Sequence, residues 1–180
     1  MSTGIQISKT DTLIRAGGSF AILGGIISAL GIVFLIAMFI FFATPNKSLG
    51  ETFGMLNDIC VALQYLLAIP VALALDQILQ PYNQGLIRFA TLLGILMMLT
   101  VIGLQMALIF GVIPFERQVG WVTLAMIVGV GSWLMMTGLV ARSTGRFPHS
   151  VLMSGIAVPY VGFPVWAFWL GWLLLGWIRL

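Results

Sequence analysis

Five long apolar runs, separated by short polar segments, dominate the pattern along the chain. They cover residues of about 16–43, 56–78, 87–113, 119–141 and 151–178. Each run is long enough to cross a hydrocarbon core of about 30 Å as a helix that rises about 1.5 Å per residue. Because a backbone in lipid must satisfy its hydrogen bonds within its own segment, each run is expected to be an α-helix.

The polar segments between the runs are short and contain proline or glycine. Their sequences are TPNKSLGETFG, QPYNQG, PFERQ and RSTGRFPHS. Connections this short make consecutive helices antiparallel neighbours. The pattern therefore predicts an all-α integral membrane protein, a five-helix up-and-down transmembrane bundle, in which residues 1–180 form a single membrane domain.

The composition agrees with a membrane protein and not with a soluble domain. Hydrophobic residues make up 61% of the chain and charged residues only 7%, whereas a soluble chain carries about a quarter charged residues. The net charge is +3, but the basic residues are scattered singly over the connections and form no patch. A nucleic-acid partner is therefore excluded, and the lipid bilayer is the expected partner.

The distribution of lysine and arginine predicts the orientation in the membrane. One side would hold five basic residues and the other side three: Lys9, Arg15, Arg88, Arg142 and Arg146 against Lys47, Arg117 and Arg179. Cytoplasmic connections carry the excess of basic residues. We therefore expect a multi-pass protein of the bacterial inner membrane, with its N-terminus in the cytoplasm and its C-terminus outside.

Small residues recur along the first apolar run at alternating spacings of 4 and 3 residues, which places them on one stripe of a helix. This stripe, which we call the small-residue seam, consists of Gly17, Ala21, Gly24, Ser28 and Gly31. Another helix backbone can approach such a stripe closely. A counterpart in the fourth run consists of Ala125, Gly129 and Ser132. The partner of the seam is either a helix of the same chain or a second copy of the protein.

Two aspartates bracket the second run. Asp58 and Asp76 are 18 residues apart, which is five turns, or about 27 Å along a helix. They therefore share one helix face and lie near opposite edges of a hydrocarbon core of about 30 Å. We expect Asp76 at the cytoplasmic edge, with Arg88 across the connection as its partner.

Asp58 is the leading candidate for a functional group, because it would lie just below the outer headgroups. Its candidate partners are Lys47, Arg117 and the hydroxyl of Tyr65, which is two turns deeper on the same face. A buried carboxylate without a partner is costly in a membrane. Asp58 is therefore either part of an ion pair that caps the bundle or a site for a proton or a cation.

Two amides, Gln64 and Gln105, lie deeper in the second and third runs. Both are expected to face protein, because lipid offers an amide no hydrogen-bond partner. They either form interhelical hydrogen bonds or, together with Asp58, make the outer half of the bundle more polar than the inner half.

Prolines interrupt the second and fifth runs at Pro70, Pro159 and Pro164. Each proline removes one backbone donor and frees a carbonyl. Such positions either kink a helix or expose backbone groups that bind a substrate. The fifth run also carries Trp166, Trp169, Trp172 and Trp177. These tryptophans would form an aromatic belt or a surface on which a quinone or carotenoid stacks.

The side chains that catalysis needs are scarce. The chain has one histidine, His149, in a connection, and one cysteine, Cys60; both lysines lie outside the predicted spans. No cluster of metal ligands and no catalytic motif is present in the sequence. We therefore predict no catalytic residue, no metal site and no cofactor, with an apolar pigment, quinone or lipid left open as a ligand.

The stretch VALALDQILQPYNQGLIRFATLLGI resembles one that is common in small bacterial polytopic membrane proteins sharing a domain of unknown function. Those proteins also have an aspartate early in the preceding helix, where Asp58 stands, and a turn similar to ILQPYNQG. This chain has Gln77 and Ile78 where such proteins have a tyrosine. The resemblance covers about the second and third runs, implies a polytopic helical bundle, and carries over no catalytic residue.

These observations favour a non-catalytic inner-membrane protein that acts as a structural or accessory subunit of a membrane complex or of a homo-oligomer. The small-residue seam and the scarcity of catalytic side chains support this hypothesis. A small transporter or channel with an outer polar vestibule at Asp58 is the first alternative. The second alternative is a protein that binds an apolar lipid, quinone or carotenoid.

Overall fold

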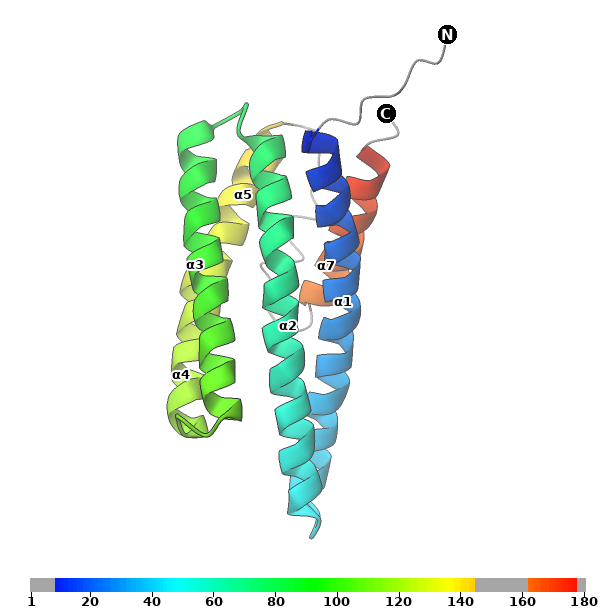
Figure 1. Ribbon diagram of the computed structural model, residues 1–180, viewed down its shortest axis with the longest axis vertical. Coiled ribbons are helices and arrows are strands. Elements are labelled where there is room, and N and C mark those ends of the chain that lie inside the picture. The colour runs from blue at the N-terminus through cyan, green and yellow to red at the C-terminus, as the bar shows by residue number, and fades with distance from the viewer. Residues whose placement is uncertain (1–8, 145–161, 178–180) are drawn as a thin grey trace.

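The computed structural model describes residues 9–144 and 162–177, and every element in these ranges is helical (Figure 1). The first three helices are α1 (Lys9–Phe42), α2 (Lys47–Leu79) and α3 (Gln84–Ile109). A fourth passage consists of α4 (Phe115–Leu124), the π-helical segment η1 (Ala125–Val130) and α5 (Gly131–Ser143). The last described helix is α7 (Gly162–Trp177). The prediction of an all-α fold is confirmed.

Four helical passages are long and apolar enough to cross a membrane. They cover Asp11–Phe42, Lys47–Leu79, Gln84–Ile109 and Phe115–Ser143, whereas the apolar helix Phe163–Gly176 is shorter. Large apolar side chains such as Ile36, Leu92 and Ile127 are exposed on the outside of the bundle. Exposed apolar side chains in this number are typical of a surface that contacts lipid rather than water.

The direction of α7 differs from the sequence prediction. Gly18 of α1 lies against Leu175, and Gly25 lies against Phe168, so seven residues forward along α1 correspond to seven residues backward along α7. Helix α7 is therefore antiparallel to α1 and ends beside the start of α1 (Figure 1). In an up-and-down bundle a fifth span runs parallel to the first. Helix α7 therefore does not have the direction that the up-and-down prediction requires.

The described part of α7 is short. Its 16 residues extend about 24 Å at 1.5 Å per residue, which is less than a hydrocarbon core of about 30 Å. Of the predicted fifth span of about 151–178, only Gly162–Trp177 is described. Its residues up to 161, with Pro159, lie outside the described residues, as does His149.

Helix α2 begins at Lys47, nine residues before the predicted start of the second run. Packing within the α1–α2 hairpin explains the difference. Gly50 lies against the ring of Phe42, and the rings of Phe41 and Phe53 stack with their centroids 5.3 Å apart. These contacts make the polar segment after Asn46 helical, although its glycines alone would weaken a helix.

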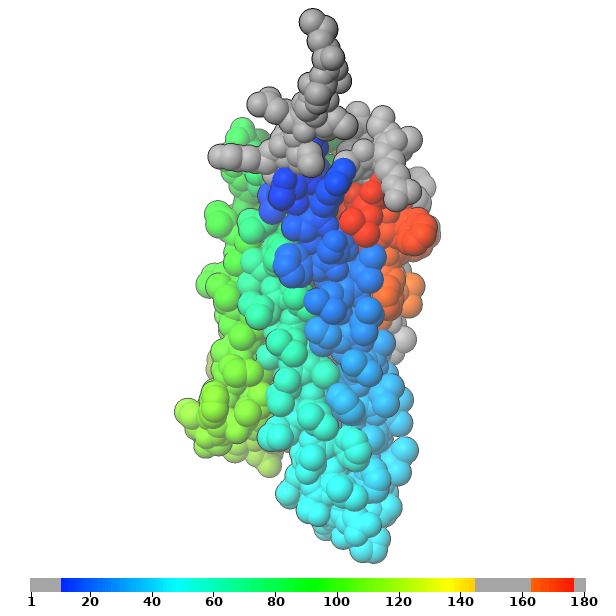
Figure 2. All heavy atoms as spheres, turned by 45° about the vertical axis from the view of Figure 1, so that its right-hand side comes forward, coloured from blue at the N-terminus to red at the C-terminus, as the bar shows by residue number. Residues whose placement is uncertain are grey.

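The small-residue seam faces α2 within the same chain. A Cβ added to Gly17 would lie 2.5 Å from the Cβ of Ala74, and one added to Gly31 would lie 3.2 Å from the Cβ of Cys60. Ala21, Gly24 and Ser28 are buried between them. The neighbouring stripe of Gly18 and Gly25 faces α7, and α1 and α7 lie side by side (Figure 2). Helix α1 therefore packs between α2 and α7 through small residues on two adjacent stripes.

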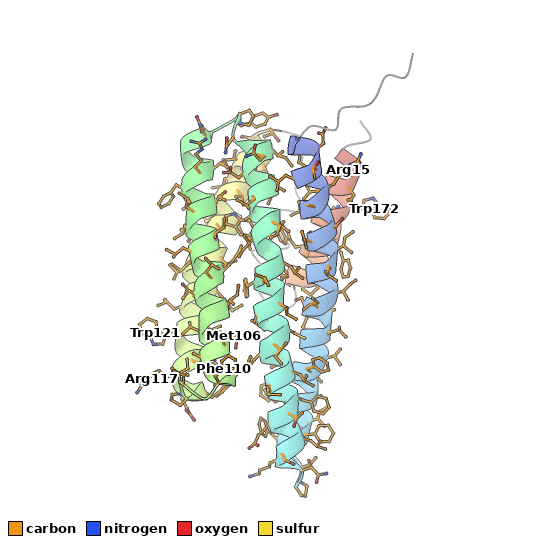
Figure 3. All side chains as sticks on the ribbon, viewed as in Figure 1. Arg15, Met106, Phe110, Arg117, Trp121 and Trp172 are labelled. Carbon is orange, nitrogen blue, oxygen red and sulfur yellow. The ribbon has the colours of Figure 1, made fainter. Side chains whose placement is uncertain are left out.

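Aromatic side chains fill the centre of the bundle. Trp133 of α5 is fully buried and meets Trp166 of α7 edge to face, with the ring centroids 6.1 Å apart. Gly94 of α3 leaves room for Trp133, since a Cβ there would lie 2.6 Å from its indole Cγ. Trp166 is thus a core residue rather than part of an interfacial belt. Trp172 is 76% exposed and points outward (Figure 3).

The prolines in the described helices do not break them. Pro70 lies inside α2, which continues through it, and its carbonyl oxygen would lie 3.4 Å from a Cβ on Gly17. Pro164 lies in the first turn of α7, where a helix needs no backbone donor. The irregular segment is instead η1, where Gly129 packs against the side chain of Met97.

Candidate ligand-binding site

The α1–α2 hairpin is longer than the α3–α4 hairpin. The turn at residues 80–83 joins α2 to α3, and both helices extend from it toward the same end of the bundle. Helix α2 has 33 residues, whereas α3 has 26. The seven additional residues correspond to about 10 Å of helix. The end of the α1–α2 hairpin therefore projects beyond the α3–α4 turn, as Figures 1 and 2 show. We call this projecting end the arm.

A pocket of about 800 Å³ lies between the arm and the end of the α3–α4 hairpin. Its walls come from α1, α2, α3 and α4, and most of its lining side chains are apolar. Phe39 and Phe42 line it from α1, and Phe115 and Val122 line it from α4. The polar lining residues are Glu51, Asn57, Asp58, Gln105, Gln118 and Thr123.

Three of the polar side chains form a layer across three helices. Asp58 lies 21 residues before Leu79, and Gln105 lies 21 residues after Gln84, so the two lie at the same height, about 31 Å from the α2–α3 turn. Gln118 of α4 donates from its Nε2 to the Oε1 of Gln105 at 2.8 Å, and both amides are buried. We call Asp58, Gln105 and Gln118 the polar layer.

The structure brings together two of the four residues singled out from the sequence. Asp58 and Gln105 both line the pocket. Gln64 and Tyr65 are buried deeper in the bundle, and Tyr65 packs against the ring of Phe163 with the centroids 6.4 Å apart. Neither of them is among the lining residues. The predicted polar outer half thus consists of the polar layer, with Gln64 and Tyr65 outside it.

The ion pair considered for Asp58 is not formed within the described part of the chain. Lys47 lies at the end of the arm and is exposed. Arg117 lies on the outer side of α4 and points away from the bundle (Figure 3). Neither side chain pairs with Asp58, which is half-buried at the pocket.

Sequence reasoning missed Gln118 and Glu51, although both have a signal in the sequence. Gln105 and Gln118 are placed almost symmetrically about the turn at residues 110–114, so two antiparallel helices bring them to the same height. Glu51 lies seven residues before Asp58. Two helical turns separate them, and both therefore lie on one face of α2.

The opposite end of α2 differs from this arrangement. Gln80 donates from its Nε2 to the Oδ2 of Asp76, while Arg88, the partner expected from the sequence, is exposed. The other carboxylate oxygen, Oδ1, is buried and has no hydrogen-bond partner. Among the residues with known placement, Thr91 and Trp133 also have a buried polar atom without a partner. These atoms lie in the packed core and line no described pocket.

The pocket is suited to binding. Ligand sites are concave, measure about 300–1,000 Å³, and combine apolar walls with a few polar groups. Within residues 9–144 and 162–177, no three side chains of His, Cys, Asp or Glu gather as metal ligands would. The arrangement can therefore hold an apolar body against the phenylalanines and a polar group against the polar layer.

No protein-family model matches the chain, and no curated protein or solved structure shows significant similarity to it. The fold and the site define the class: an all-α bundle with four helices able to cross a membrane and a pocket at one end.

Proposed function

We propose that the protein is a non-catalytic, multi-pass membrane protein that binds an apolar, lipid-like molecule in the pocket beneath the arm. The pocket of about 800 Å³ is the observation that carries this proposal. Its size matches that of small-molecule sites, and its apolar walls match a lipid-like body. The family of small bacterial membrane proteins suggested by the second and third helices is compatible with this proposal.

In the proposed membrane placement, the pocket is accessible from lipid. The polar layer lies inside apolar surroundings, because Phe39 and Phe42 still present apolar rings further along the arm. An apolar ligand would enter from the bilayer with its polar group toward Asp58.

We place the start of α1 and the end of α7 in the cytoplasm of a bacterial cell. Among basic residues in the described helices, four lie at that end and two at the other: Lys9, Arg15, Arg88 and Arg142 against Lys47 and Arg117.

A pocket-filling substitution tests the proposal. Val119 lines the pocket and is 45% exposed, so Val119→Trp fills space there with little disturbance of the core. Val128→Trp adds the same side chain at a position that is 58% exposed and outside the pocket lining. The neutral fluorophore N-phenyl-1-naphthylamine is titrated against the parent protein and both variants in nanodiscs.

We expect saturable binding by the parent and by Val128→Trp, and at least a severalfold loss of affinity in Val119→Trp. Lipid extraction and the absorption spectrum of the purified protein then identify any molecule that co-purifies. Identical titrations of all three proteins, with no saturable component, would reject the proposal.

A small transporter with a vestibule at Asp58 is the second candidate, because Asp58 and Glu51 both line the pocket. It predicts a pH-dependent flux into liposomes that Asp58→Asn abolishes. An absence of flux with the parent protein rejects it.

The accessory-subunit hypothesis now has less support. It depended on the small-residue seam, and this seam is buried against α2 in the same chain. A complex would have to use another surface. Crosslinking in native membranes tests this directly, and a partnerless monomer would argue against it.

A further inference from the structure

We infer that the pocket selects organic cations, in which a single positive charge is carried on an apolar body. This inference depends on the proposed binding function and specifies the chemical class of its ligand. It is carried by the charges, the aromatic rings and the apolar walls of the pocket.

The charges that line the pocket are all negative. Glu51 and Asp58 lie on the same face of α2, seven residues apart, which is about 10 Å along the helix. The lining residues that the structure describes include no lysine, arginine or histidine. Arg117 is next to the lining residue Gln118, but it points away from the bundle (Figure 3).

The surroundings of Asp58 strengthen its effect on a ligand, whereas Glu51 is exposed. Asp58 is half-buried, and two charges attract each other several times more strongly at a protein site than in bulk water. A cleft lined by one sign of charge also raises the local concentration of the opposite sign. An anionic ligand would instead be repelled by both carboxylates.

Aromatic rings on two sides of the pocket add to the preference for a cation. Phe39 and Phe42 line it from α1, and Phe115 lines it from the start of α4. The face of an aromatic ring attracts a cation, most strongly where water is excluded. Quaternary ammonium groups are recognised in this way.

The same walls argue for an organic cation over a metal ion. Calcium takes six to eight oxygen ligands, whereas in the described part of the chain no three acidic, histidine or cysteine side chains gather. The mainly apolar lining replaces little of the hydration shell of a small ion. It can, however, cover the apolar body of a phosphonium or an alkylammonium ion.

A pair of probes with the same shape and opposite charge tests this inference. Tetraphenylphosphonium and tetraphenylborate each carry four phenyl rings around one central atom. Binding of each ion is measured by equilibrium dialysis in detergent for the parent, Asp58→Asn, Asp58→Glu and Glu116→Gln. Glu116 is the matched control, because it is an exposed carboxylate on α4 outside the pocket lining.

We expect the parent to bind the phosphonium at least about tenfold more tightly than the borate. Asp58→Asn should weaken phosphonium binding by about tenfold or more and leave or improve borate binding, while Asp58→Glu and Glu116→Gln should retain the preference. Equal binding of both ions by the parent would overturn the inference, as would equal losses in Asp58→Asn and Glu116→Gln.

The neutral fluorophore separates this inference from the proposed function. If the fluorophore binds in the pocket and the two ions bind equally, the pocket binds apolar molecules without charge selection. If the fluorophore does not bind either, the proposed function itself fails. The comparison of the two ions needs only the parent protein, so it remains decisive even if Asp58→Asn does not fold.

Discussion

The contact between Gly17 and Ala74 is the tightest point of the small-residue seam, and it provides a quantitative test of how α1 and α2 pack. In Gly17→Ala the new Cβ would lie 2.5 Å from the Cβ of Ala74, whereas carbon atoms pack at about 3.5–4.0 Å. Neither methyl group can rotate away, because each Cβ is fixed to its own backbone. The two helices must therefore move apart by about 1 Å at this point.

The magnitude follows from two opposing terms. Helix propensity favours alanine over glycine by about 1 kcal/mol, whereas overpacking costs about 1–3 kcal/mol. Because both contacting atoms are rigid, we expect the upper part of that range and a net loss of about 1–2 kcal/mol for Gly17→Ala. Ala74→Gly removes the opposing methyl group, so the double variant should recover most of the loss. The coupling energy between the two sites should be about 2 kcal/mol.

The free energy of unfolding in mixed micelles, measured for the parent, both single variants and the double variant, checks this prediction. Gly103→Ala is the control, since a Cβ at Gly103 meets nothing within 4 Å and should be neutral or stabilising. Strict additivity of the two single substitutions would refute the close approach of α1 and α2. Unchanged stability with a changed oligomeric mass would instead show that the seam contacts a second copy.

Two further predictions concern the polar layer and the core. Gln118→Leu leaves the amide of Gln105 without its buried partner and should lower the free energy of unfolding by about 1 kcal/mol. Substitution of both glutamines by leucine should recover part of this loss. Melting in micelles measures both variants, and equal losses in the single and double variants would contradict the pairing. Trp166→Ala should lower the free energy of unfolding by about 3–5 kcal/mol, because the ring of Trp166 packs against Trp133. Trp172→Ala, at a site that is 76% exposed, should lower it only slightly. Similar losses for the two variants in the same melting assay would argue against a buried Trp166.

The apolar pattern was sufficient to predict the helices and much of their packing. Runs of more than 20 apolar residues are expected to form α-helices in lipid, and the structure has four helices of the required length. The spacing from Gly17 to Gly31 also predicted one close-packing stripe, because residues three and four apart share a helix face. Which helix fills that stripe was left open, and the structure places α2 there.

The direction of α7 could not be derived from hydropathy. The run of about 151–178 is apolar throughout, and hydropathy alone does not determine whether its helix is parallel or antiparallel to the first. The contacts of Gly18 and Gly25 with α7 decide the question, because they depend on side chains that are distant in sequence. The same limitation applies to Trp166, whose burial against Trp133 depends on a contact between helices that are distant in sequence.

The pocket depends on a difference in helix length that the apolar runs concealed. The segment KSLGETFG has the composition of a connection, so the second helix was expected to begin only after it. In the structure it is helical, because Gly50 lies under Phe42 and Phe53 stacks on Phe41. Without these contacts α2 would begin near the height of the α3–α4 turn, and the arm would not exist.

The arm is therefore held by packing between its own two helices, without support from α3 or α4. The arm side of the pocket is stabilised by the Phe41–Phe53 stack, and the α3–α4 side is stabilised separately by the hydrogen bond between Gln118 and Gln105. The two walls of the pocket therefore have separate supports. Under the proposed function, such a site admits an apolar molecule between two separately supported walls, with Asp58 at a fixed height on α2.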